Sequence, residues 1–153
     1  MKISLVCISS LLVGLTIGYF IEMIHAGSQF ADTLSLIKET ELAESGDHTF
    51  KAYQNESTLI AVYALTQDLA ALQDAAQLVD DPTSSFQREV HRRMMLDHAR
   101  LAKLLAASGA SSASTNHIAE ALKCASGSGR LSSITNEAQL FDIVAKFDSK
   151  GVY

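Results

Sequence analysis

The chain has 153 residues, with 12 Lys and Arg against 17 Asp and Glu, and its formal net charge at pH 7 is −5. It contains one proline, no tryptophan and no long alternation of β-branched with polar residues, so the composition argues against a β-rich fold and predicts an all-α chain. The two cysteines, Cys7 and Cys124, lack the paired spacing of a zinc or redox motif. Metalloprotease, haem-attachment, nucleophile-elbow and phosphate-loop motifs are also missing, so we expect no catalytic residues, no cofactor and no metal.

Residues 3–21 form a run of 19 residues without a charged side chain. A helix of that length rises about 28 Å, close to the ~30 Å hydrocarbon core of a bilayer. The run is longer than the ~7–15 apolar residues of a secretory signal, so we predict a transmembrane signal anchor over residues 1–26. The alternative is a signal peptide cleaved after Ala26, which would leave a secreted protein.

The charges around this span predict its orientation. Lys2 precedes the span, whereas the next lysine or arginine is Lys38. Because basic residues are retained on the cytoplasmic side, we expect a single-pass protein of the bacterial inner membrane, with a cytoplasmic N-terminus and a periplasmic C-terminal domain.

Small residues recur every four positions within the span, at Ser10, Gly14 and Gly18. Such a face lets two membrane helices approach closely. The lipid bilayer is one expected partner, and the three residues are a candidate packing face for a homo-oligomer or for docking on another membrane protein. The alternative interpretation is the ordinary composition of a membrane span or signal sequence, in which glycine and serine are common.

After the span, the pattern predicts a juxtamembrane helix and turn over residues 27–48 and an α-helical domain over residues 49–153. The turn is expected at Ser45, Gly46 and Asp47, and the following helix is expected over about residues 50–79. Its uncharged stretch, residues 57–67, is too short to cross a bilayer and is expected in the core. Pro82 should end the helix, because proline has no backbone donor and restricts the residue before it.

A third helix is predicted from a cap at Thr83 or Ser84 to about Ala107. Its basic side chains share one face, opposite an apolar face, and are Arg88, Arg92, Arg93, Arg100 and Lys103. Residues 28–85 carry ten acidic and two basic residues, so the basic face is expected to pair with this acidic half or with anionic lipid headgroups. Nucleic acid is not an expected partner, because aromatic residues are not interleaved with the basic ones.

Two further helices complete the predicted domain. One covers about residues 114–125, and the last begins at Thr135 or Asn136, where Asn136 and Gln139 have the spacing of a capping box. The last helix is predicted to present Leu140, Val144 and Phe147 on one side.

Polar residues keep two other function classes open. The candidate metal ligands lie on one flank of the third helix and are His91, Met94, Met95 and His98. His91 and His98 are two turns apart, about 10 Å, so a metal-binding or ligand-binding bundle would need partners from another helix. An enzyme of unknown class would have to use carboxylates that we otherwise expect in solvent, namely Glu56, Asp68 and Asp97.

The helices around Gly109 resemble one degenerate tetratricopeptide unit. The residues that carry the resemblance are Leu101, Ala102, Leu105, Gly109, Ile118, Ala121 and Leu122. Ser114 stands where the family usually has alanine, and the terminal proline of the unit is missing. The spacing predicts an antiparallel helical hairpin whose contact is formed by Leu101, Leu105, Ile118 and Leu122.

Residues 52–65 and 98–105 also resemble uncharacterised small bacterial proteins built as one membrane span and a helical domain, which implies a structural or interaction role. The sequence therefore predicts a membrane-anchored, extracytoplasmic helical module that binds another membrane or periplasmic protein without catalysis.

Overall fold

The computed structural model describes residues 37–38, 40–78, 81 and 84–151, and the chain divides into two compact units, Met1–Lys38 and Glu39–Tyr153. The predicted membrane anchor, residues 1–26, lies outside the described residues together with Ser10, Gly14 and Gly18. Within the described ranges, no helix is long and apolar enough to span a bilayer. The described part of the second unit is helical and contains no strand, which confirms the prediction of an all-α bundle.

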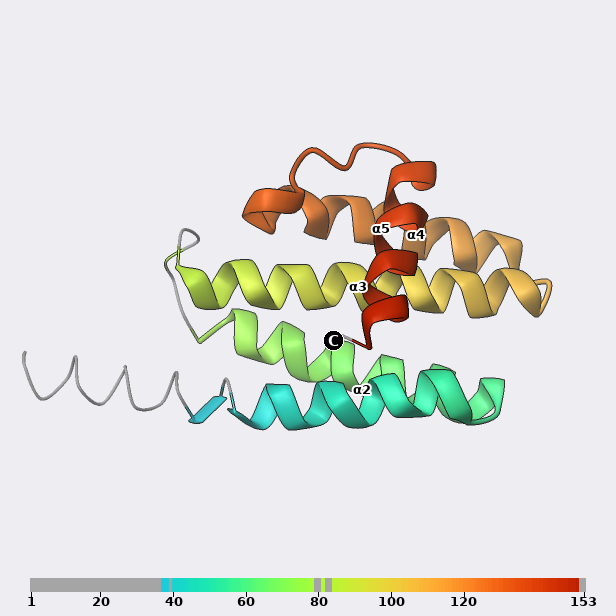
Figure 1. Cartoon of the computed structure of the whole chain (residues 1–153), viewed down its shortest axis with the longest axis horizontal. Coiled ribbons are helices and arrows are strands. Elements are labelled where there is room, and N and C mark those ends of the chain that lie inside the picture. Colours follow the sequence, from blue (N-terminus) through green and yellow to red (C-terminus); the bar gives the residue numbers. More distant parts are fainter. Residues whose placement is uncertain (1–36, 39, 79–80, 82–83, 152–153) are drawn as a thin grey trace, which may run out of the picture. The chain divides into compact units, whose positions relative to one another are not determined.

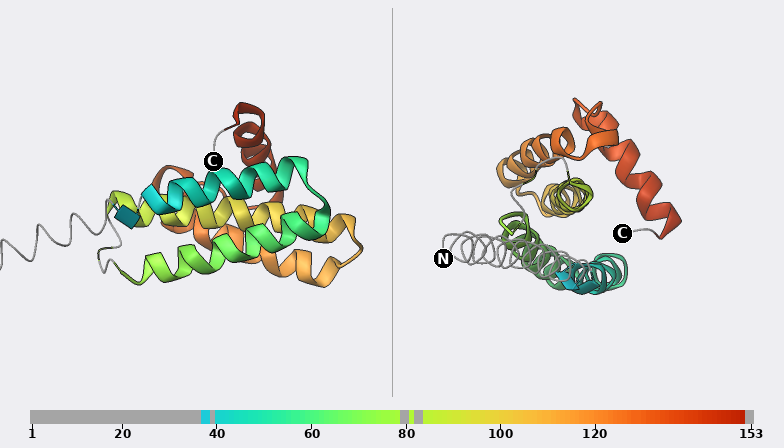
Figure 2. Two further views of the ribbon diagram at one scale, coloured as in Figure 1. Left: turned by 90° about the horizontal axis from the view of Figure 1, so that it is seen from below. Right: turned by 90° about the vertical axis from the view of Figure 1, so that its left-hand side faces the viewer.

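The second unit starts with a helix over residues 40–55, called the 40–55 helix below. It is followed by α2 (Thr58–Ala76), α3 (Ser85–Ala107), α4 (Ser111–Gly127), the short 3-10 helix η1 (Gly129–Leu131) and α5 (Glu137–Lys150). The 40–55 helix and α2 form an antiparallel pair on one side of α3, and α4 runs antiparallel to α3 on the other side (Figure 1). Figure 2 shows α3 nearly end-on between α4 and α2, with α5 leading away from the α4 side. α3 is thus the central helix.

Side-chain caps start two of these helices where the sequence predicts. Ser84 Oγ accepts a hydrogen bond from the backbone N–H of Gln87 at 3.1 Å, which confirms the cap of α3. Asn136 Oδ1 accepts from the N–H of Gln139 at 3.0 Å at the start of α5. The Gln139 side chain accepts in return from the N–H of Thr135 at 3.0 Å, so both helix starts follow from interactions within four residues.

The predicted turn at residues 45–47 is wrong, because the 40–55 helix continues through it. Leu42, Gly46, Thr49 and Phe50 are all buried and follow one another at helical spacing. Burial of this stripe outweighs the ~1 kcal/mol by which a glycine disfavours a helix interior. The chain instead reverses at residues 56–57, and α2 ends at Ala76, before the predicted residue 79.

Within the described part of the chain, three clusters of buried apolar residues form the core. The largest joins α3, α4 and α5 and consists of Met95, Leu96, Ala99, Ala121, Cys124, Ala125, Ile134, Leu140 and Val144. A second consists of Leu42, Leu72, Ala75, Phe86 and Val90, and a third of Leu65, Leu69 and Leu101. Leu140 and Val144 are fully buried, as predicted, and Phe147 packs beside them.

Cys124 lies in the largest cluster as a free, buried thiol and packs there as a small hydrophobic side chain. Burial, with a further contribution from Glu120, raises the pKa of this thiol to about 11. Cys124 is therefore protonated near neutral pH and is a poor nucleophile.

Candidate interaction surface

Large apolar side chains are exposed on the first two turns of α2. Leu59, Ile60 and Tyr63 keep 79%, 48% and 65% of their surface accessible. Their positions i, i+1 and i+4 place them on one side of the helix, and we call them the α2 patch. A single exposed leucine is ordinary, whereas several neighbouring exposed apolar side chains make this side of α2 a candidate interaction surface.

The predicted core position of residues 57–67 is therefore correct only in part. Ala61 and Leu65 are buried, but the α2 patch is not. Among the described helices, α3 and the 40–55 helix lie beside α2 (Figure 2). The sequence carries a signal for this, since residues 57–67 place apolar side chains on more than one side of the helix.

The exposed side of α2 also lacks charge. From residue 57 to residue 73 the one charged side chain is Asp68, and it is 1% exposed. Exposed Thr66, Gln67 and Ala70 continue the surface beyond the α2 patch. The uncharged helix surface is thus about 25 Å long at ~1.5 Å per residue.

A shallow groove lies beside the α2 patch, at the tip of the pair formed by the 40–55 helix and α2. Its volume is about 610 Å³, and its lining residues are His48, Lys51, Ala52, Asn55, Glu56 and Ile60. Lys51 already bonds Asp47 at 2.5 Å, and Asn55 donates to the backbone oxygen of Lys51 at 3.1 Å. The groove adds a polar rim to the apolar patch.

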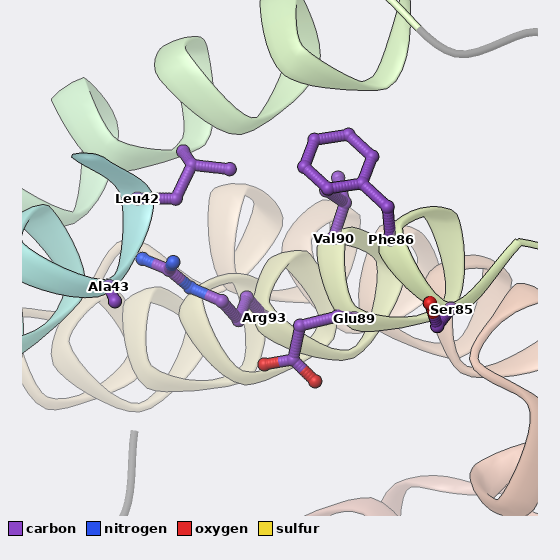
Figure 3. Close-up of a pocket in the computed structure, with 7 residues that line it drawn as sticks. All are labelled: Leu42, Ala43, Ser85, Phe86, Glu89, Val90 and Arg93. Atoms are coloured by element: carbon purple, nitrogen blue, oxygen red, sulfur yellow. The ribbon is translucent and has the colours of Figure 1, made fainter. Parts of the chain in front are cut away.

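A second pocket, of about 480 Å³, opens between the 40–55 helix and α3 (Figure 3). Its lining residues are Leu42, Ala43, Ser85, Phe86, Glu89, Val90 and Arg93. Figure 3 shows the Arg93 side chain reaching toward Leu42. Arg93 forms an ion pair with Asp68, and Glu89 forms one with Arg92. Both charged residues that line the pocket are therefore already paired.

Asp68 is the centre of a buried polar cluster that joins three helices. Its carboxylate accepts from Ser45 Oγ at 2.5 Å and from Arg93 Nη2 at 3.2 Å. The three residues lie on α2, the 40–55 helix and α3. The expectation that Asp68 is a solvated helix charge is wrong, because the helices on either side cover it.

Arg100, two turns further along α3 than Arg93, is the centre of a second buried cluster. It is fully buried, donates from Nη2 to Asp148 Oδ1 of α5 at 2.8 Å, and lies 3.6 Å from Asp97 Oδ1. Its guanidinium carbon is 4.7 Å from the centre of the Phe50 ring and 5.5 Å from that of Tyr53. Arg100 thereby connects α3 with α5 and with the 40–55 helix.

Two sequence expectations are corrected by these clusters. The predicted basic face opposite the apolar face does not include Arg93 and Arg100, because both side chains are buried and paired inside the bundle. Asp97, another expected solvated charge, is fully buried, whereas Glu56 is exposed as expected. The pairing of Arg93 with Asp68 confirms that part of the basic helix pairs with the acidic half of the chain.

Two histidines from different helices meet at the interface of α3 and α4. Nδ1 of His98 lies 2.8 Å from Nδ1 of His117, so one ring donates and the other accepts. Burial and the nearby His117 lower the pKa of His98 to about 4, against an opposing effect of Glu120, and burial also lowers the pKa of His117. Both imidazoles are therefore neutral at neutral pH.

The other histidine of the predicted flank, His91, packs against the glycine at the end of α4. A Cβ atom at Gly127 would lie 2.3 Å from His91 Cδ2, and burial lowers the pKa of His91. Among the residues with described positions, no three His, Cys, Asp or Glu side chains are grouped to hold a metal ion.

The predicted hairpin residues lie in different parts of the core. Leu101 belongs to the cluster with Leu65 and Leu69, whereas Ile118 and Leu122 pack against the largest cluster. Leu105 is half-buried. Gly109, with a φ of 84°, lies between α3 and α4 and allows the tight reversal.

Ser114 occupies the position at which the tetratricopeptide family usually has alanine. It is buried, and its hydroxyl donates to the backbone oxygen of Ala102 at 2.9 Å. The bond links α3 directly to α4.

Comparisons with known proteins add no relative from which a role could be inferred. No protein-family model matches the sequence, and no curated protein or solved structure matches it.

Proposed function

We propose that the chain is a membrane-anchored helical module that binds another protein at the outer face of the bacterial inner membrane and performs no catalysis. The observation that carries this proposal is the α2 patch, three adjacent apolar side chains on a helix surface without charge. Interaction sites commonly combine an apolar centre with a polar rim, and the groove beside Ile60 supplies such a rim.

The arrangement of the acidic residues favours binding over catalysis. Asp68 and Asp97 are the buried carboxylates that an enzyme would most readily use, and Arg93 and Arg100 hold them in ion pairs inside the bundle. A general acid or base must instead reach a substrate. These charges serve to connect helices.

The α3–α4 pair supports a likeness to a tetratricopeptide hairpin, because the two helices run antiparallel and are joined at Gly109 (Figure 1). A solenoid groove needs about three such hairpins in series. We therefore assign partner binding to the α2 patch and a structural role to the hairpin.

Membrane anchoring rests on the uncharged run over residues 3–21 and on Lys2 before it. Alkaline carbonate extraction of membranes, combined with N-terminal sequencing, tests it. We expect the intact chain in the membrane fraction. A soluble product that begins at Gly27 would instead establish the secreted alternative.

The binding function is tested by placing a photo-crosslinking amino acid at Gln67, beside the α2 patch, in the full chain within native membranes. The matched control carries it at Asn116, an exposed residue of α4. We expect one identifiable protein to be captured from Gln67 and not from Asn116, and its binding to the purified chain to weaken at least tenfold in Leu59→Ser. Equal capture from both positions, or binding that is insensitive to Leu59→Ser, would refute the proposal.

The His98–His117 contact favours one second candidate, a metal-binding bundle. Two nitrogens bound to one zinc ion at ~2.0–2.1 Å lie about 3.3 Å apart in tetrahedral geometry, which requires only a small separation of these rings. Elemental analysis of the purified chain distinguishes the candidates. Stoichiometric zinc or copper that is lost when both histidines are replaced by glutamine would favour the metal-binding bundle.

A further inference from the structure

We infer that the partner of the α2 patch is the α2 patch of a second copy of this chain, in an antiparallel two-fold pair. This inference rests on the proposed function, because it names the occupant of the same surface. It starts from the position of Leu59, Ile60 and Tyr63 on one exposed side of α2, separate from the clusters that hold the bundle together.

Charge is the first argument for a second copy. The chain carries a net charge of −5, so two copies repel each other over most orientations. The exposed side of α2 is uncharged from residue 57 to residue 73, about 25 Å at ~1.5 Å per residue. When two α2 patches meet antiparallel about residue 61, residues 57–65 of the two copies face each other. No charged side chain lies in this overlap, so the surface has the self-complementarity that a two-fold pair requires.

The same charges argue against a lipid surface as the occupant. Helices that lie in a membrane interface carry lysine and arginine beside their apolar face. The uncharged part of α2 is bordered by Glu56 and Asp74, and residues 28–85 carry ten acidic and two basic side chains. Anionic headgroups would be repelled from this region.

The small size of the patch indicates a weak pair. With roughly 180 Å² for a fully exposed large side chain, the exposed parts of the three residues amount to about 350 Å² per copy. Two copies would bury about 700 Å², below the ~1,200 Å² of a stable interface. If each copy is held in the same bilayer by its own predicted span, the effective concentration of one α2 patch near another rises, and this favours the pair.

Cysteine crosslinking of the full chain tests the inference. Gln67→Cys places a thiol beside the α2 patch without altering it, in a chain that also carries Cys7→Ser so that the buried Cys124 is the remaining native thiol. A bismaleimide crosslinker with a long spacer is added to membranes that contain this variant, because antiparallel patches centred near residue 61 separate the two residue-67 positions by about 18 Å along the helices. The yield of covalent dimer is then measured. Asn116→Cys is the matched control.

We expect a dimer from Gln67→Cys, little from Asn116→Cys, and at least a tenfold lower yield when Leu59→Ser is added. Leu78→Ser, which removes another exposed leucine, should leave the yield unchanged. Circular dichroism verifies that the helical content of every variant is equal. A dimer yield that is equal at both positions, or insensitive to Leu59→Ser, would overturn the self-pairing.

Two further outcomes separate this inference from the proposed function. Capture of a different protein at the α2 patch, without a dimer, overturns self-pairing and leaves the binding function in place. Loss of binding to phosphatidylglycerol vesicles in Leu59→Ser, without a dimer, overturns both, because it makes the lipid surface the occupant.

Discussion

Acidification should destabilise this bundle through His98. The side chain is buried against His117, and its pKa falls from the ordinary value of 6.5 to about 4. The unfolded chain therefore binds a proton at a higher pH than the folded chain does. Stability from this residue is fully present above about pH 6.5 and is lost as the pH falls toward 4.

The two pKa values of His98 determine the size of the effect. With 6.5 in the unfolded chain and about 4 in the folded chain, linkage predicts a loss of roughly 2 kcal/mol in the free energy of unfolding between pH 7 and pH 5. The loss reaches roughly 3 kcal/mol at pH 4. The lowered pKa values of His91 and His117 act in the same direction.

Urea unfolding of the full chain in a non-ionic detergent, followed by circular dichroism at pH 7 and pH 5, measures this loss. We expect His98→Gln to lose about 2 kcal/mol less than the wild type over this range. His48→Gln, which alters an exposed histidine, should behave like the wild type. An equal pH dependence in His98→Gln and wild type, or greater stability at pH 5, would show the reasoning to be wrong.

Three further substitutions test the packing of the bundle by the same urea titration. Asp68→Ala should lower the free energy of unfolding by about 3–5 kcal/mol, because it leaves the buried Arg93 without its carboxylate partner. The control Asp74→Ala, on the exposed side of α2, should change it by less than about 0.5 kcal/mol, and similar losses in both variants would contradict the buried ion pair. Gly127→Ala should lower the free energy of unfolding by about 1–3 kcal/mol, because the added methyl group clashes with His91. In the double variant with His91→Ala this loss should be smaller, and losses that simply add would mean that the two residues do not touch. Leu101→Ala should cost about 2–5 kcal/mol as a cavity in the core, and a cost below 1 kcal/mol would place Leu101 outside it.

The starts of α3 and α5 could be predicted from the sequence, because helix caps depend on residues that are neighbours along the chain. The caps at Ser84 and Asn136 act over three residues, and the side chains that accept those hydrogen bonds are visible in the sequence itself. The burial of Leu140 and Val144 followed from helical spacing for the same reason. The candidate site was harder to predict from the sequence, because the α2 patch lies in residues 57–67, whose apolar composition indicates a core position.

The sequence by itself determined the all-helical class that the described residues show, the positions of the main helix caps, and the uncharged run at residues 3–21. Only the tertiary structure decided which sides of the helices are covered. Asp68 meets Ser45 across 23 positions and Arg93 across 25, and Arg100 meets Asp148 across 48. The periodicity of one helix cannot report such contacts, because burial is decided by the helices that pack against it. The same physical reason explains why Gly46 continues a helix and why Leu59 and Tyr63 remain exposed.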